Sequence, residues 1–149
     1  MAVVSKGFTL LELLVVISII GIIMAIGSVS FSTAQKKGRD SRRQGDMKAI
    51  QKSLEQYYAL DNAYPDSVTS GGNIVYLTNT LMNVVPYDPK NSGDYVYTYM
   101  AVPVTFSGYC MCAFLDNDGS GNASTVGASG VCAWATGATA DYFCVSNQQ

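Results

Sequence analysis

Residues 8–31 read FTLLELLVVISIIGIIMAIGSVSF and decide the first half of the fold. Among these 24 residues only Glu12 is charged, and at 1.5 Å per residue a helix of this length measures about 36 Å. A bilayer core is about 30 Å thick, so the run is long enough to cross it. A cleaved secretory signal peptide is the weaker interpretation, because its apolar region spans only about 7 to 15 residues. The run therefore predicts a membrane-spanning helix.

The same helix is predicted to continue through residues 32–60 with a different surface. Met47, Ile50, Leu54 and Tyr57 follow one another at steps of three, four and three residues, which is helical spacing. The run contains no proline that would break it. A helix with one apolar stripe buries that stripe against another element. We therefore expect this amphipathic half to pack on a head domain.

The rest of the chain, residues 61–149, is rich in Gly, Ser, Thr, Asn and aromatic residues and is predicted to form a β-rich head. The sequence DNAYP at residues 61–65 favours a turn that ends the helix. Three strands are expected, at residues 95–106, 110–115 and 142–145, with a loop at 116–139. The predicted fold class is α+β, with the long helix packed on a small antiparallel sheet of three to five strands.

The amino-acid composition argues against most classes of enzyme. The chain has no histidine, which excludes His-based acid/base catalysis and His-containing triads. A net charge of −2 with 13% charged residues gives no overall basic field for nucleic acid. We predict that the chain is not an enzyme, has no small-molecule substrate and needs no cofactor, and that the subunit itself does not bind nucleic acid.

The segment KGFTLLELLVV closely resembles the class III signal of type IV pilins and pseudopilins. That signal has a short basic leader ending in Gly, then Phe, then Thr or Ser, and a Glu at the fifth mature position. Gly7, Phe8, Thr9 and Glu12 hold these places. The resemblance implies that a prepilin peptidase cleaves between Gly7 and Phe8 and that Phe8 is then N-methylated.

The resemblance also implies a division of the chain and a function. The parts are a leader at 1–7, a transmembrane and filament-core helix at 8–31, its amphipathic half at 32–60 and the head at 61–149.

The function that the resemblance implies is that of a pilin, a homo-oligomeric subunit of an extracellular type IV pilus serving adhesion, twitching motility or DNA uptake. Its partners would be the pilus assembly platform and minor pilins. Before assembly it would be a single-pass cytoplasmic-membrane protein with the head outside. The alternatives are a pseudopilin of a type II-like secretion system and a membrane-tethered binding domain.

Glu12 needs a cation if it lies in hydrocarbon, where an unpaired carboxylate costs several kcal/mol. The nearest one is the amino terminus that cleavage would expose at Phe8, on the same helix or on a neighbour. We predict that Glu12 and the Phe8 amine pair and fix the axial register of packed helices.

The sequence KKGRDSRR at residues 36–43 places five cations just after the apolar run, against Lys6 before it. This opposes the usual positive-inside bias, although the cleavage motif favours a head outside. The cations are expected to pair with Asp40, Asp46 and Glu55 when subunits stack. DNA binding by the cluster is the alternative.

Four cysteines, Cys110, Cys112, Cys132 and Cys144, lie in the last 40 residues. An even number in an exported head predicts two disulfides. A four-thiolate zinc site is the alternative. Cys110 and Cys112 face the same side of a predicted strand, and an antiparallel return strand would pair later cysteines with earlier ones in nested order. We predict the pairs Cys110–Cys144 and Cys112–Cys132.

The loop DNDGSGN at residues 116–122 places Asp116, Asp118 and Ser120 at alternate positions before a glycine. This is the first half of an EF-hand calcium loop. Position 12 is Gly127 instead of the bidentate Glu, so a calcium ion would need further oxygen ligands. A plain polar turn is the alternative. Weak calcium binding through the three side chains, completed by carbonyls, water or a carboxylate such as Asp141, is the lesser hypothesis beside the turn.

Overall fold

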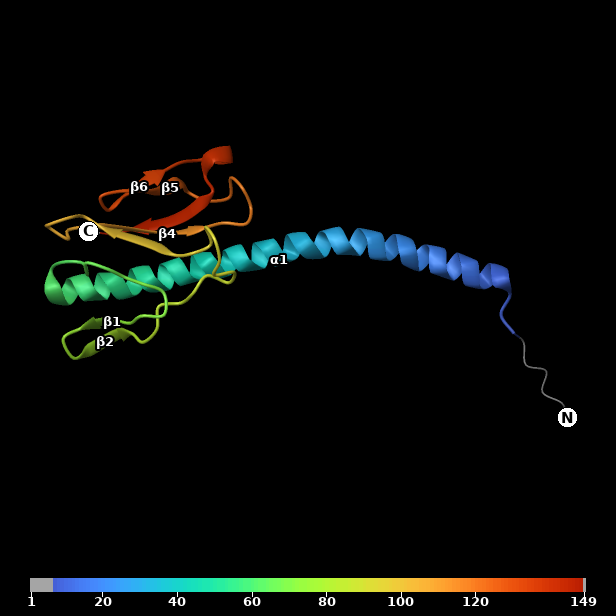
Figure 1. Cartoon of the computed structure of the whole chain (residues 1–149), viewed down its shortest axis with the longest axis horizontal. Coiled ribbons are helices and arrows are strands. Elements are labelled where there is room, and N and C mark those ends of the chain that lie inside the picture. Colours follow the sequence, from blue (N-terminus) through green and yellow to red (C-terminus); the bar gives the residue numbers. More distant parts are fainter. Residues whose placement is uncertain (1–6, 149) are drawn as a thin grey trace. The chain divides into compact units, whose positions relative to one another are not determined.

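The computed structural model describes residues 7–148, without the side chains of Ser28 and Val29. It divides into two compact units, Met1–Gln35 and Lys36–Gln149. Helix α1, Leu10–Asp61, runs through both, and seven strands and one short 3-10 helix follow it in the described part of the second unit (Figure 1). One long N-terminal helix followed by antiparallel sheets makes the chain an α+β protein, as predicted.

In the first unit, α1 exposes its apolar side chains. None of its most apolar window of 18 residues is buried in the single chain, and by length and composition this part is able to cross a membrane. The exposed large side chains are Leu10, Leu11, Leu13, Leu14, Val15, Val16, Ile17, Ile19, Ile20, Ile22, Ile23, Met24, Ile26 and Phe31.

α1 ends where a residue takes up the left-handed conformation. Asn62 has a φ of 57°, and its N–H donates to the carbonyl oxygen of Tyr58 at 2.7 Å. Asparagine tolerates this conformation better than most residues and is a common helix terminator in it. The end of the helix therefore lies within the DNAYP turn signal.

In the second unit, one stripe of α1 forms the centre of the core. Met47, Ile50 and Leu54 are fully buried, as their spacing predicts, and Tyr57 packs at the edge of the same cluster. Burying an apolar side chain of this size stabilises a fold by about 1.5–3 kcal/mol. The remaining core side chains are Tyr64, Val68, Ile74, Val85, Tyr97, Tyr109, Met111, Ala113 and Val145.

The C-terminal half of α1 lies between two β layers (Figure 1). One layer is an antiparallel hairpin of β1, Ile74–Tyr76, and β2, Asn79–Met82. The other is a five-stranded antiparallel sheet of order β3-β4-β7-β5-β6. Its strands are β3, Thr98–Ala101; β4, Tyr109–Phe114; β5, Ala123–Ala128; β6, Val131–Trp134; and β7, Tyr142–Ser146, with the 3-10 helix η1, Gly137–Thr139, before β7.

The loop predicted at residues 116–139 is wrong, because it contains the β5–β6 hairpin. Ser129 and Gly130 form its turn with φ angles of 51° and 76°. Two positive φ angles give the twist that a two-residue hairpin requires. The strands are rich in Ala, Ser and Thr, so they lack the large alternating side chains that mark a strand. β1 and β2 were also not predicted, and β3 is shorter than the expected run at 95–106.

Candidate functional site

The start of α1 is a capping box formed by Thr9 and Glu12. The Glu12 carboxylate accepts hydrogen bonds from the Thr9 backbone N–H at 2.8 Å and from its hydroxyl at 2.9 Å. In return, Thr9 Oγ1 accepts from the Glu12 backbone N–H at 3.2 Å. The pattern Thr-x-x-Glu before an apolar run is the sequence signal for this arrangement. A carboxylate inside an apolar segment thereby gains hydrogen bonds from its own helix.

The capping box places the Glu12 carboxylate next to the predicted cleavage point. Thr9 directly follows Phe8, so the oxygen that binds the Thr9 N–H lies one residue from the nitrogen that cleavage after Gly7 would expose. Gly7 and Phe8 are both exposed, Phe8 at 90%. The geometry is compatible with a Glu12–amine pair. Cleavage, methylation of Phe8 and the ion pair stay predictions.

Comparison with known proteins finds the predicted motif in this segment. A family model described as a prokaryotic N-terminal methylation motif matches residues 4–28. The chain therefore carries this motif at the predicted cleavage and methylation segment. It is 32% identical over 62 residues to the type IV major pilin protein PilA of Myxococcus xanthus, a region that is 42% of this chain. The chain covers 28% of that relative's length. No solved structure matches.

The head of this pilin-like chain contains a buried ion-pair network around Arg43, whose side chain is fully buried. Its Nε and Nη2 donate to the two carboxylate oxygens of Asp88 at 2.6 and 3.0 Å. Its Nη1 donates to Asp40 at 2.7 Å and to Asp116 at 3.1 Å. Charge-assisted bonds of this bidentate kind are stronger than neutral ones. The network connects α1 to two loops of the head.

Two further cations form ion pairs with Asp116. Arg39 Nε donates to it at 2.6 Å, and the Lys90 ammonium pairs with its other oxygen. The ring of Tyr95 lies 3.7 Å from the Lys90 nitrogen and 4.9 Å from the Arg43 guanidinium carbon, within the range of cation–π attraction. No described side-chain polar atom that is buried lacks a hydrogen-bond partner. The network is therefore fully satisfied within one chain.

The expected pairing of the basic cluster between subunits is wrong for its central members. Arg39 and Arg43 pair inside the chain, and Asp40 accepts from Arg43 and from the backbone N–H of Asp116 at 2.8 Å. Asp46 accepts from the Tyr97 hydroxyl at 2.7 Å. Arg39, Arg43, Asp40 and Asp46 therefore have partners within the fold.

Asp88 lies in a turn between Pro86 and Pro89. Its Oδ1 accepts a hydrogen bond from the backbone N–H of Lys90 at 2.8 Å, which stabilises the turn. The same carboxylate binds Arg43. The sequence shows an Asp in the pattern Pro-x-Asp-Pro-Lys and an Arg on the buried side of the helix. It does not show that these two segments are in contact, so this ion pair could not be predicted.

The network shifts two pKa values. Burial by itself would raise the pKa of Asp116, but hydrogen bonds from Lys90, Arg39 and Arg43 outweigh it and hold that pKa well below its usual range. Burial would lower the pKa of Arg43, and the bonds to Asp88, Asp40 and Asp116 raise it above its ordinary value. Both groups are therefore charged at neutral pH.

We expect acid to destabilise the head through Asp116. A carboxyl group with a depressed folded pKa contributes stability above its unfolded pKa of about 3.9, and this contribution is lost as pH falls toward the folded value. Asp116→Asn should lower the free energy of unfolding at pH 7 and flatten its decline between about pH 4 and pH 2. The measurement is urea unfolding of the full chain in detergent, followed by Trp134 fluorescence.

The matched control is Asp94→Asn, because Asp94 is an exposed carboxylate on a head loop. It should keep the wild-type dependence of stability on pH. If Asp116→Asn retains the wild-type slope in acid, the network does not control the acid sensitivity.

The predicted calcium loop follows β4. The Asp116 carboxylate is occupied by Arg39, Arg43 and Lys90, and the Ser120 hydroxyl donates to the carbonyl oxygen of Asn117 at 2.5 Å. Asp118 is exposed. A calcium ion that uses Asp116 would have to replace its present partners. Calcium binding by these three side chains stays a prediction.

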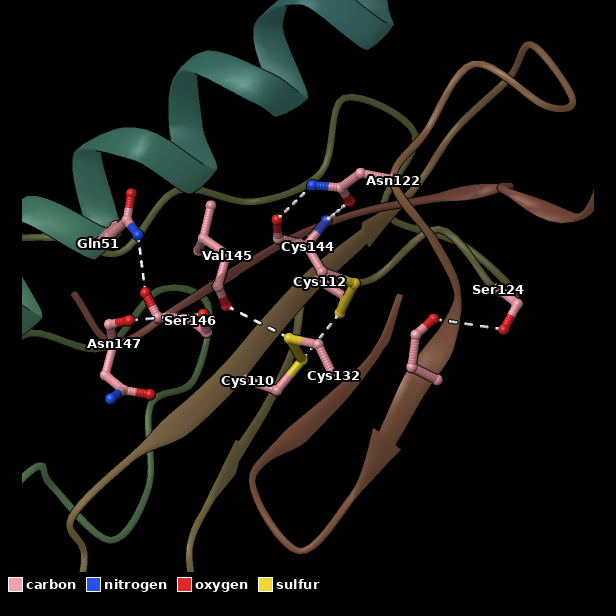
Figure 2. The surroundings of a disulfide bond; sticks show 11 residues. Gln51, Cys110, Cys112, Asn122, Ser124, Cys132, Cys144, Val145, Ser146 and Asn147 are labelled. Carbon is pink, nitrogen blue, oxygen red and sulfur yellow. Dashed lines mark hydrogen bonds between the residues drawn. A yellow bond between two sulfur atoms is a disulfide. The ribbon is translucent and has the colours of Figure 1, made fainter. Parts of the chain in front are cut away.

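The head contains two disulfides, as predicted, but the predicted pairing is wrong. Cys110 is bonded to Cys132 and Cys112 to Cys144 (Figure 2). In the antiparallel β4–β7 ladder Cys112 lies directly opposite Cys144, with Cα atoms 4.1 Å apart, and Cys110 lies opposite Ser146. The nested order assumed a single return strand for both later cysteines. Cys132 comes instead from β6, which contacts β4 although β7 and β5 stand between them in the strand order.

Proposed function

We propose that this chain is a structural subunit of a type IV pilus, assembled through its N-terminal helix. The observation that carries the proposal is a methylation motif at residues 4–28 on a helix whose apolar side chains are exposed in the single chain. Apolar surface of this extent has a strong tendency to leave water. Lipid would cover it before assembly, and the helices of other copies would cover it in the filament.

Processing would begin at the leader. A prepilin peptidase would cleave between Gly7 and Phe8 and methylate the new amino terminus of Phe8. The Glu12 carboxylate accepts the Thr9 N–H at 2.8 Å, one residue from the new amine, which supports a pair with that amine. In a packed bundle the amine of a neighbouring helix would be the other candidate. Glu12 would then favour one axial register of the packed helices.

The proposed location follows from the same parts. The precursor would be a single-pass protein of the cytoplasmic membrane with its disulfide-bonded head outside, and the mature chain would be part of a surface fibre. Its partners would be other copies, the assembly platform and minor pilins. Adhesion, motility or DNA uptake would be functions of the fibre, with no catalysis in the subunit. The similarity to a major pilin favours a pilus over a secretion pseudopilus.

Glu12→Ala should leave precursor cleavage intact and reduce filament yield by more than about tenfold. A buried amine without its partner costs several kcal/mol, and 1.4 kcal/mol already corresponds to a factor of ten. Mass spectrometry of the N-terminal peptide measures cleavage and methylation at Phe8, and electron microscopy of sheared material measures filaments.

Thr9→Ala is the matched control, since it removes the capping hydroxyl and keeps the carboxylate. Its filament yield should stay near that of the wild type. Normal filaments from Glu12→Ala would contradict the role of Glu12 in register. A wild-type chain that is neither methylated at Phe8 nor found in filaments would contradict the pilin function itself. A secretion defect on deletion, without long filaments, would assign the chain to a pseudopilus.

A further inference from the structure

The sulfur atoms of all four cysteines occupy one small volume of the head. They lie within 4.8 Å of one another, although they come from three strands: Cys110 and Cys112 from β4, Cys132 from β6 and Cys144 from β7 (Figure 2). The two sulfurs on β4 belong to different disulfides and are 3.4 Å apart. The fold thus brings together a complete set of four sulfur ligands.

We propose that the head, when its cysteines are reduced, binds one soft divalent cation of the zinc class through these four sulfurs. Four thiolates in a tetrahedral arrangement are the typical ligand set of a structural zinc site. A Zn–S bond is about 2.3 Å long, so the sulfurs of such a site are about 3.8 Å apart. The sulfurs of different disulfides are 3.4 Å apart on β4 and no two of the four are more than 4.8 Å apart, so this value lies within their present range of distances. Only the two bonded pairs would have to separate.

The surroundings of the sulfurs suit a structural site. All four cysteines are buried, and they pack against Ala123, Val126 and Tyr142. Cys132 also lines a surface pocket of about 350 Å³ whose described lining has no ionisable side chain other than the cysteine itself. A cation or a small reductant would reach the cluster through this pocket. Four buried sulfur ligands leave no open coordination position, which is typical of a structural site as opposed to a catalytic one.

The proposed states are related by balanced chemistry. A dithiol reductant transfers two electrons and two protons to each S–S bond, which gives two thiols and a disulfide of the reductant. Binding of the divalent cation then releases four protons and leaves a four-thiolate complex of charge −2. Reaction with two equivalents of a disulfide oxidant re-forms both S–S bonds and releases the cation. A newly made chain, which has four thiols before oxidation, would pass through the same site.

The cation would connect the β5–β6 hairpin to the rest of the head. The β5–β6 hairpin pairs with the rest of the sheet at one register position, Ala123 with Tyr142. Its buried side chains are those of Ala123 and Cys132, with Val126 partly buried. Because binding energy at a structural metal is also folding energy, the cation would keep this hairpin in place until the disulfides form.

The experiment uses the full chain in detergent micelles, reduced under argon with a water-soluble phosphine and titrated with Co²⁺. We expect the visible absorption of tetrahedral cobalt thiolate to saturate at one ion per chain, and Zn²⁺ to abolish it. The oxidised chain should show no such absorption. Zn²⁺ should also raise the urea midpoint of the reduced chain, because a ligand that binds only the folded state stabilises it.

Matched variants separate the site from scattered thiols. Cys144→Ser should lower the cobalt affinity and change the spectrum, whereas Ser146→Ala, on the same strand, should change neither. In urea the cobalt absorption should disappear together with the near-ultraviolet signal of the tyrosines. If the reduced chain has lost that signal, Zn²⁺ should restore it. Absence of a tetrahedral thiolate spectrum, a different stoichiometry, an unchanged spectrum in the unfolded chain or failure of Zn²⁺ to restore the fold would each overturn the proposal.

Discussion

Replacing Arg43 by methionine is expected to destabilise the head by about 3–5 kcal/mol, the usual cost of removing one partner from a buried ion pair. The reason is that Asp88 and Asp116 stay buried after the substitution and lose their shared guanidinium. Methionine fills much of the same volume, so lost packing contributes little. Urea unfolding of the full chain in detergent, followed by Trp134 fluorescence and tyrosine circular dichroism, measures the loss.

Two controls show whether burial and geometry cause the effect. Arg42→Met removes a cation from the same helix whose nitrogen is 3.8 Å from Asp46 and whose side chain is 62% exposed, so it should cost less than about 1 kcal/mol. Arg43→Lys keeps the charge but not the planar guanidinium that binds Asp88 through two nitrogens. Its loss of unfolding free energy should therefore lie between those of Arg42→Met and Arg43→Met. Equal losses for Arg42→Met and Arg43→Met would mean that the network adds nothing beyond a surface ion pair.

The helix could be predicted because its signals are local. The apolar run sets its first half, the 47–50–54 spacing sets its buried stripe, and the DNAYP turn sets its end within one residue of Asp61. The class III signal is also local, which is why the comparison with known proteins found the same segment. Each of these features is contained in a window of about seven helical turns or less.

The ion network and the disulfide pairing could not be predicted because they depend on contacts between distant segments. Arg43 and Asp88 are 45 residues apart, and both are common surface residues when read alone. The pairing of Cys132 depends on the β5–β6 hairpin, whose Ala, Ser and Thr residues gave no strand pattern. One missed hairpin was enough to reverse the assignment of both disulfides.

Removing the Cys110–Cys132 disulfide by a double substitution to serine is expected to cost about 3 kcal/mol, since cross-linking a loop of this length restricts the unfolded chain by about that amount. Cys112→Ser/Cys144→Ser should cost nearly the same, because the separations of 22 and 32 residues differ little on a logarithmic scale. Urea unfolding under oxidising conditions measures both losses. Peptide mapping without reductant should recover the 110–132 and 112–144 linked peptides from the wild type.

The two variants should differ in where the head opens. β4 and β7 remain joined by a five-residue ladder without the Cys112–Cys144 bond. The β5–β6 hairpin, in contrast, would depend on its contact between Ala123 and Tyr142 and on Asn122, whose side chain binds both the N–H and the carbonyl oxygen of Cys144. Limited proteolysis should therefore cut within residues 123–134 only in the Cys110→Ser/Cys132→Ser protein. Equal protection of the hairpin in both variants would show that Asn122 and the sheet hold it without the disulfide.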